Sequence, residues 1–369
     1  YFHSIVRDSK GQKMSKTLGN YSDPIQLMDT YGADALRFTI VYLAPLGNDV
    51  LFDDEKTLIG RNFITKIWNA GRMLYTNREN IKIDESSVET VTQNIDLVDL
   101  WIDSRLNNVI TEAKGYLFQY RLNDYTKTLY NFVWNDFCDW YLEMLKVKIH
   151  RNPENALSSI NRAIEVYEEI LKILHPVIPF VTEELWHLMK EGREEMSISF
   201  EQLPQSSVSA SENNYETDFS KIISLINSIR NIRANKNLSY SKKISARIRP
   251  FDTQAGLLLD SMLQYVMKIC NIETVDDSFE ATKLMSAETV SEGFQVQAFF
   301  EGDEIDGKQM EKIKKDLENL ESYVANISKK LSNENFLAKA SPEIILKERE
   351  KMSEAEEKLA KLKSIISSS

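Results

Sequence analysis

The sequence has few cysteines, few histidines and no long apolar run. The two cysteines, Cys138 and Cys270, stand far apart among 369 residues and form no CxxC pair, which argues against a disulfide framework and a cysteine-based zinc site. None of the four histidines has a ligand-like spacing with a nearby acid, so we predict no metal site. No run of about eighteen apolar residues occurs, which excludes a membrane-spanning helix. We expect two reduced thiols in a cytoplasmic protein with no membrane partner.

The start of the chain lacks both a methionine and a signal-peptide pattern. It begins with Tyr1, and the residues that follow show no charged segment leading into an apolar one. We interpret the chain as a piece of a longer protein. Its length suits about two to four domains, and a hydrophobic content of 42% allows real cores to be buried.

Acidic residues are missing from two stretches of a chain whose net charge is −11. The negative total argues against non-specific binding of nucleic acid. However, no Asp or Glu occurs at 56–78 or at 219–251, and both stretches can attract a polyanion locally. Their basic residues are Lys56, Arg61, Lys66, Arg72 and Arg78, then Lys221, Arg230, Arg233, Lys236, Lys242, Lys243, Arg247 and Arg249.

Helical patterns dominate from about residue 25 to residue 190. Prolines and loop-forming residues interrupt them near 45–48, 80–94, 151–153 and 175–179. The aromatic-rich segment 130–141 is predicted to be bundle core rather than a platform for stacked bases. The pattern therefore indicates an α-helical bundle.

A serine-rich linker at 206–211 separates the bundle from a smaller mixed region. Helical patterns at about 217–235 and 253–269 surround strand-like alternation at 243–249, and a second such run covers 294–300. We predict a small α+β domain.

Two heptad seams follow near the end of the chain. The first consists of Met310, Ile313, Leu317, Leu320, Val324, Ile327 and Leu331, and the second of Ile345, Met352, Ala355, Leu359, Leu362 and Ile366. Between them, Ser341 is a natural N-cap and Pro342 suits the first helical position. Two seams of similar length joined by a short break predict an antiparallel hairpin within one chain, and hence a monomer.

The segment Lys13–Thr17 carries the clearest chemical pattern. Two lysines, Lys13 and Lys16, lie three apart in a loop flanked by Gly11 and Gly19, whose flexibility permits movement. When a carboxylate attacks the α-phosphate of ATP, charge develops on the leaving pyrophosphate. Ammonium groups that meet this charge only in the transition state accelerate the step. By spacing alone this pattern is weak evidence, because two lysines three apart are common and usually belong to a solvated surface.

Five segments resemble the valyl-tRNA synthetases, in the family's order and over essentially the whole chain. KMSKTLGN at 13–20 is similar to the KMSKS signature of class I aminoacyl-tRNA synthetases, and GADALR at 32–37 to the start of their anticodon-binding helices. The remaining three, RNFITKIWNA at 61–70, HPVIPFVTEELW at 175–186 and LSNENFLAKA at 331–340, resemble the family's bundle and coiled-coil tip. Thr17 replaces the final Ser of the signature and keeps its hydroxyl.

The resemblance implies a mainly α fold with four parts. These are the end of a catalytic domain (1–28), an anticodon-binding helical bundle (29–205), a linker and small α+β domain (206–303), and a C-terminal antiparallel coiled-coil hairpin that binds tRNA (304–369). No HIGH-like segment occurs, so the resemblance implies that the chain alone neither completes the activation site nor edits. The whole enzyme would join valine to its tRNA with ATP and Mg²⁺, and we expect no cofactor in this chain alone.

Two other interpretations stay open. The C-terminal part of an isoleucyl- or leucyl-tRNA synthetase shares the bundle, but the coiled coil and the 61–70 helix argue against it. A non-catalytic tRNA-binding or coiled-coil protein belongs to another class, and it would have no use for the loop at 13–17.

Residues 61–75 divide into two faces when they are placed on a helix at about 100° per residue. One face is apolar and includes Phe63, Ile67 and Trp68, and the other has cations and amides but no acid. That polar face suits phosphate and sugar contacts. The candidate tRNA contacts are Arg37, Arg61, Asn62, Lys66, Asn69, Arg72, Arg230 and Arg233. The candidate ATP loop is Lys13, Met14, Ser15, Lys16 and Thr17, with Lys13 and Lys16 catalytic.

Overall fold

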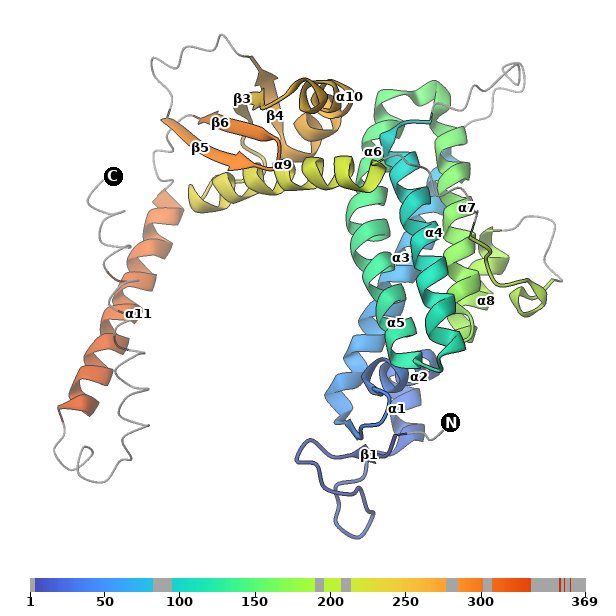
Figure 1. Cartoon of the computed structure of the whole chain (residues 1–369). Coiled ribbons are helices and arrows are strands. Elements are labelled where there is room, and N and C mark those ends of the chain that lie inside the picture. The colour runs from blue at the N-terminus through green and yellow to red at the C-terminus, as the bar shows by residue number, and fades with distance from the viewer. Residues whose placement is uncertain are drawn as a thin grey trace. The chain divides into compact units, whose positions relative to one another are not determined.

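The computed structural model describes residues 4–81, 95–189, 196–206, 214–276, 285–300 and 307–332, together with Met352, Ala355 and Leu359. The chain divides into two units, one of residues 1–280 with 286–298 and one of residues 281–285 with 299–369. Figure 1 shows the order of the elements along the chain.

A small N-terminal layer supports the loop at 13–17. Strand β1 (Val6–Arg7) pairs in parallel with β2 (Val50–Leu51), and helices α1 (Pro24–Tyr31) and α2 (Ala33–Leu43) lie between them in the chain. A short helical turn, η1 (Asp54–Lys56), follows β2. Leu27, Val50 and Phe52 form the core of this layer, and Met14 packs against it. The first 28 residues, predicted to be loop-like, thus contain one short strand and the start of α1.

Long helices form the bundle, as the sequence predicts (Figure 1). They are α3 (Thr57–Asn80), α4 (Leu97–Phe118), α5 (Leu122–Asn131), α6 (Leu142–Arg151), α7 (Ala156–Leu174) and α8 (Pro179–Met189), with short turns η4 (Pro153–Asn155) and η5 (Ile198–Phe200). Gly60 lets α3 approach α2, because a Cβ there would lie 2.2 Å from the carbonyl oxygen of Ala35.

A ten-residue π-helical segment, η3 (Phe132–Tyr141), joins α5 to α6. The sequence patterns did not predict this π-helical segment. Its hydrogen bonds join residues five apart instead of four, and the spacing of apolar residues does not reveal that difference. Phe137 stacks on Tyr141 and Tyr167, with ring centroids 5.6 and 5.8 Å apart. The prediction that this aromatic segment is core is confirmed for Phe132, Phe137 and Tyr141, which are all buried.

The α+β region has two helices and a four-stranded sheet. Its elements are α9 (Tyr215–Asn235), β3 (Ile244–Pro250), α10 (Thr253–Cys270), β4 (Ile272–Val275), β5 (Met285–Ser291) and β6 (Phe294–Phe300). The strand order is β4-β3-β6-β5, and β3 pairs in parallel with β4. Both predicted helices and both predicted strands are confirmed. Strands β4 and β5 were missed, because most of their side chains are exposed or half-buried and so show little apolar alternation.

The second unit contains helix α11 (Gly307–Leu331). Ile327 is buried at 5% exposure, and the seam residues Leu317, Leu320 and Val324 are less exposed than their neighbours. Met352, Ala355 and Leu359 are also helical, and Ala355 is buried. These observations agree with the predicted seams. The predicted turn at 332–342, with its cap Ser341, lies outside the described residues apart from Ser332.

Candidate functional site

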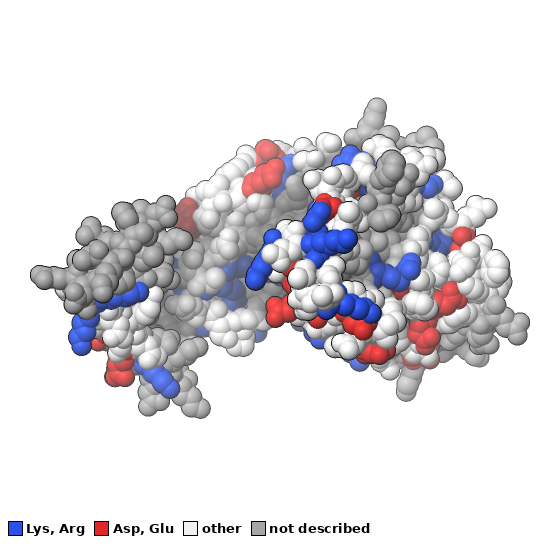
Figure 2. Space-filling view, turned by 90° about the horizontal axis from the view of Figure 1, so that it is seen from below, with Lys and Arg blue, Asp and Glu red and all other residues white. Residues whose placement is uncertain are grey.

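The loop that carries Lys13 and Lys16 projects from the β1 end of the molecule. Gly11 and Gly19 both have positive φ angles, of 76° and 66°, which favour glycine. An isolated antiparallel bridge joins Lys13 to Arg7. Seen from this end, several Lys and Arg side chains gather on the protruding part, with acidic side chains beside them (Figure 2).

Asn20 fastens the base of this loop. Its side-chain nitrogen donates to Asp8 Oδ2 at 2.9 Å and to the carbonyl oxygen of Lys13 at 3.2 Å, and its oxygen accepts from the Ser15 amide at 2.9 Å. The hydrogen bond from Asn20, together with backbone donors, lowers the pKa of Asp8. The sequence analysis missed Asn20 and Asp8. The available signal was the tendency of Asn and Asp to bond nearby backbone groups in loops.

The two ammonium groups of the loop point into solvent. Lys13, Lys16 and Thr17 are exposed, whereas Met14 packs inward on the N-terminal core. Lys16 Nζ lies 5.3 Å from the centre of the Tyr21 ring, a contact that an exposed side chain can exchange for a phosphate at modest cost. The loop therefore combines a fastened base with two exposed lysines.

The polar face of α3 is present as predicted for four of its residues. Arg61, Asn62, Asn69 and Arg72 are all exposed. Trp68, predicted to lie on the apolar face, is instead 37% exposed. Helices α2, α7 and α8 cover the face of α3 that carries its buried residues. Trp68 lies at the edge of that face and therefore stays in solvent.

Lys66 differs from the other cations of this face. Its Nζ lies 2.5 Å from Asp139 and 4.1 Å from the centre of the Trp134 ring, both on η3. The side chain is only 23% exposed. Lys66 is therefore paired within the bundle, which a helical wheel could not show because the acid lies on a neighbouring segment. A contact of Lys66 with tRNA stays a prediction.

Arg37 grips the turn between α7 and α8. Its Nε donates to the carbonyl oxygen of Val177 at 3.1 Å, and an Nη donates to that of Pro176 at 3.2 Å. The Asp34 carboxylate, one turn earlier on α2, accepts from the amide of Val181. Arg37 is nevertheless an exposed residue.

The two candidate arginines of α9 have different surroundings. Arg230 is exposed and lies 5.3 Å from the centre of the Trp140 ring. Arg233 is 5% exposed and donates to the carbonyl oxygens of Cys270, Ser239, Lys242 and Asn271. These donors hold together the loops of the α+β region, and a contact of Arg233 with tRNA stays a prediction.

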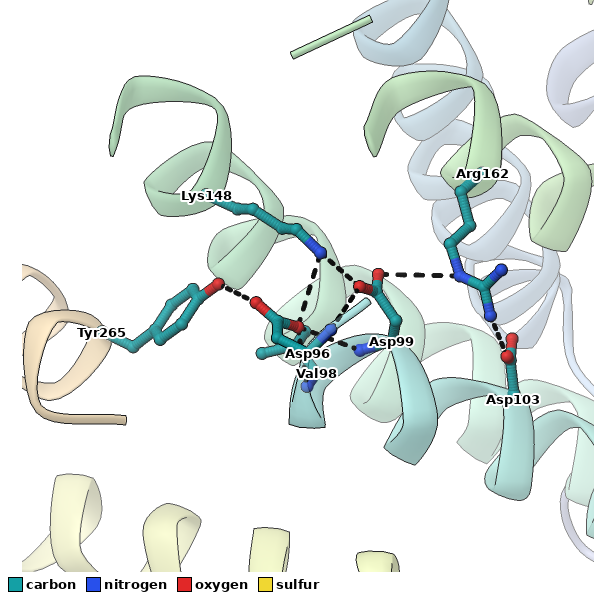
Figure 3. Close-up of polar contacts among 7 residues, drawn as sticks. All are labelled: Asp96, Val98, Asp99, Asp103, Lys148, Arg162 and Tyr265. Atoms are coloured by element: carbon teal, nitrogen blue, oxygen red, sulfur yellow. Dashed lines mark hydrogen bonds and ion pairs between the residues drawn. The ribbon is translucent and has the colours of Figure 1, made fainter. Parts of the chain in front are cut away.

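A buried polar network joins the bundle to α10 (Figure 3). Lys148 is 3% exposed and contacts Asp99 and Asp96, and Tyr265 donates to Asp96. Asp96 and Asp99 also form the capping box that starts α4. Arg162 contacts Asp99 and Asp103 from α7. Burial raises the pKa of Asp99, although the Lys148 ammonium opposes the rise.

The start of α9 is held against α4 by a second set of contacts. The rings of Trp101 and Phe219 stack with centroids 3.8 Å apart. Arg105 bonds both Asp136 of η3 and Glu216 of α9, at 2.9 and 3.1 Å. The start of α9 is therefore packed and ion-paired against the bundle.

Neither a metal cluster nor a membrane helix is found in the part of the chain that the structure describes. Within those ranges no group of three or more His, Cys, Asp or Glu could hold a metal ion, and no helix could cross a membrane. Cys138 and Cys270 are free and buried, and burial raises the pKa of each thiol to about 12. Such thiols remain protonated near neutral pH and are poor nucleophiles.

Sequence models of three protein regions match the chain in order. Residues 1–53 match class I tRNA synthetases (I, L, M and V), residues 99–248 match the anticodon-binding domain of tRNA ligases, and residues 307–368 match the valyl-tRNA synthetase tRNA binding arm. The first match includes the loop at 13–17, and the second runs from α4 into β3.

Curated valine–tRNA ligases align along nearly the whole chain. The enzyme of Chlorobaculum tepidum is 36% identical over 98% of the chain and 41% of its own length. That of Listeria innocua is 36% identical over 97% of the chain and 40% of its own length, and that of Thermotoga maritima 34% over 99% and 41%. The chain therefore spans about two fifths of the length of these relatives.

Proposed function

The chain belongs to the valyl-tRNA synthetases and corresponds to their C-terminal part, and from this premise we propose that it serves in an enzyme that attaches valine to its tRNA with ATP. In that enzyme the loop of Lys13–Thr17 assists valine activation, and the bundle and arm hold the tRNA. The observation that carries the proposal is that Lys13 and Lys16 are both exposed while Asn20 and Met14 fix the loop base.

The loop would act on the pyrophosphate that leaves ATP. Lys13 and Lys16 would swing onto the oxygens that gain charge as the valine carboxylate attacks the α-phosphate, while the glycines at each end absorb the motion. Mg²⁺ accompanies ATP as its counter-ion.

The tRNA grip would use the solvent-facing cations and amides. Arg61, Asn62, Asn69 and Arg72 present one continuous polar face of α3, and Arg230 adds a cation beside Trp140. Arginine forks contact phosphates in pairs, and amides reach sugars or base edges. Lys66 would act after release from Asp139, and Arg37 and Arg233 would shape the surface that the others present.

The proposal includes three narrower expectations for the chain. By itself it would not charge tRNA, because the resemblance puts the rest of the ATP site and the valine pocket in other parts of the enzyme. It would be a monomer, and it would act in the cytoplasm. Valine-dependent exchange of pyrophosphate into ATP by the isolated chain would refute the first of these.

Charging assays test the proposal directly. An enzyme that contains this chain should charge its tRNA when supplied with valine and ATP, and isoleucine or leucine should not replace valine. Charging with leucine or isoleucine in place of valine would transfer the proposal to a sister enzyme. Loss of all charging, with retained tRNA binding, would favour a non-catalytic tRNA-binding protein.

A further inference from the structure

The first turn of α2 caps a helix that lies far away in the sequence. Asp34 is 6% exposed, and its Oδ2 accepts a hydrogen bond of 2.7 Å from the amide of Val181 in the first turn of α8. The Phe180 amide also contributes to holding the carboxylate. A carboxylate at this point satisfies amides that the helix leaves unpaired and complements the positive end of its dipole.

Arg37, one turn further along α2, completes the contact with the opposite chemistry. Its guanidinium donates to the carbonyl oxygens of Pro176 and Val177, in the turn of residues 175–178 between α7 and α8. Acid therefore meets amide and base meets carbonyl. We name this arrangement of Asp34 and Arg37 on the turn the α2 clamp.

The clamp includes a buried acceptor that the fold does not satisfy. Asp34 Oδ1 is buried and has no hydrogen-bond partner, and desolvation raises the pKa of this carboxyl against the opposing amide bonds. A cap made by a neutral amide or a hydroxyl would avoid that cost. The carboxylate is therefore held at this position against a desolvation cost, by the Val181 amide and the nearby Arg37 charge.

Helix α2, which carries both clamp residues, packs against α3 and against the layer that supports the ATP loop. On one side, Thr39 Oγ1 accepts from the Gly60 amide at 3.1 Å, and the absence of a Cβ at Gly60 brings α3 against α2. On the other side, α1 contributes Leu27 to the core on which Met14 of the loop packs. A shift of α2 relative to the α7–α8 turn would therefore be transmitted to the base of the loop.

We propose that Asp34 and Arg37 are positioning residues that fix the Lys13–Thr17 loop relative to the bundle, so that tRNA held by the bundle meets the activated amino acid in register. The inference rests on the proposed function. In this role the clamp needs no contact with ATP or tRNA. It acts on the second step, the transfer of valine to tRNA, because only in this step must the tRNA held by the bundle meet the valyl-adenylate formed beside the loop.

Two rates measured in an enzyme containing this chain test the clamp. Asp34→Ala should slow single-turnover transfer from preformed valyl-adenylate to tRNA by about tenfold, while pyrophosphate exchange stays within about twofold. Asp34→Asn keeps an oxygen that can accept from Val181 and should restore most of the transfer rate. The matched control is Asp29→Ala, an exposed acid on α1, which should change neither rate.

Three outcomes would overturn the inference. They are unchanged transfer in Asp34→Ala, an equal loss of both rates, and a failure of Asp34→Asn to recover transfer when its melting temperature matches wild type. A measurement that needs no activity separates this inference from the proposed function. Hydrogen exchange at the Val181 amide should accelerate in Asp34→Ala and not in Asp29→Ala. An inactive wild-type enzyme would refute the proposed function and leave that exchange test standing.

Discussion

Lys16 is the single residue whose proposed role depends most on timing. Its ammonium is exposed and rests near the Tyr21 ring, so its cost of moving onto pyrophosphate is small. In an enzyme that contains this chain, we expect Lys16→Ala to raise the activation free energy of valyl-adenylate formation by about 3 kcal/mol, which slows the step roughly a hundredfold. The apparent ATP affinity should change much less.

Rapid-quench measurement of adenylate formation over a range of ATP concentrations gives both quantities. Lys10→Ala, an exposed lysine of the same segment, is the matched control and should leave them unchanged. A loss confined to ATP affinity in Lys16→Ala would make the loop a ground-state clamp and would contradict the mechanism.

The three cations of α3 should contribute unequally to tRNA binding. Arg61 and Arg72 are exposed, whereas Lys66 is already neutralised by Asp139. Arg61→Ala and Arg72→Ala should each lower the slope of log affinity against log salt by about one unit or slightly less. Lys66→Ala should lower it by less than either.

Titration of valine tRNA at several salt concentrations measures these slopes. Asp139→Asn provides the matched background, because it removes the acid that pairs with Lys66. In that background, Lys66→Ala should lower the salt slope of tRNA binding as much as Arg61→Ala does. Equal slopes for all three single variants would contradict the assigned pairing, and unchanged slopes in all three would remove α3 from the tRNA interface.

Among the elements, the junction of α4, α6, α7 and α10 depends on one buried cation. Lys148 is almost fully buried between Asp96 and Asp99. Removal of one partner from a buried pair leaves an uncompensated charge, so Lys148→Met should lower the free energy of unfolding by about 3–5 kcal/mol. Lys146→Met, which breaks an exposed pair with Glu143 on the same helix, should cost less than about 1 kcal/mol. Chemical denaturation compares the two.

The same junction predicts a pH dependence. Burial raises the pKa of Asp99, so the folded state binds its proton more tightly than the unfolded state. The contribution of this group to stability therefore falls as pH rises through the window between its unfolded and folded pKa values. Without the Lys148 ammonium, this pH dependence of stability should become larger. The loss in free energy of unfolding caused by Lys148→Met should therefore be smaller near about pH 4 than near about pH 7. Equal deficits would contradict the assigned burial.

The arm is expected to fold back within one chain. An intramolecular helix pair forms at an effective concentration of order millimolar, which exceeds that of any second copy in dilute solution. Sedimentation of the chain with and without residues 304–369 should give a monomer in both cases. A dimer that dissociates when these residues are removed would assign the seams to contacts between chains.

The spacing of apolar residues predicted the helices and strands better than it predicted which side chains contact one another. The seam residues of α11 and the alternation in β6 reflect how each segment is buried, and both were recognisable from the sequence. The pairing of Lys66 with Asp139 and the burial of Arg233 depend on residues that are distant in the sequence. An angle on a helical wheel gives the face of a side chain but not the neighbour that meets it.

The candidate site shows the same division. The loop at 13–17 stood out because two lysines, a hydroxyl pair and flanking glycines recur at short range. The contacts that hold it, from Asn20 at its end and from the core beneath Met14, could be inferred only in part. The α2 clamp joins residues 147 positions apart, and no local pattern could have predicted it.

At the scale of the whole molecule, we propose that the chain serves mainly to hold tRNA. The anticodon-binding match covers residues 99–248 and the tRNA binding arm match covers residues 307–368, whereas the catalytic match is limited to residues 1–53. The net charge of −11 is compatible with this role, because the acid-free stretches concentrate cations on particular surfaces. Binding should therefore be selective and sensitive to salt.

Titration of the isolated chain with valine tRNA, alongside a leucine tRNA of similar length, measures this claim most directly. The account predicts saturable binding that weakens as salt rises and that favours the valine tRNA at every salt concentration. Equal affinity for the two tRNAs, or no binding at low salt, would contradict it.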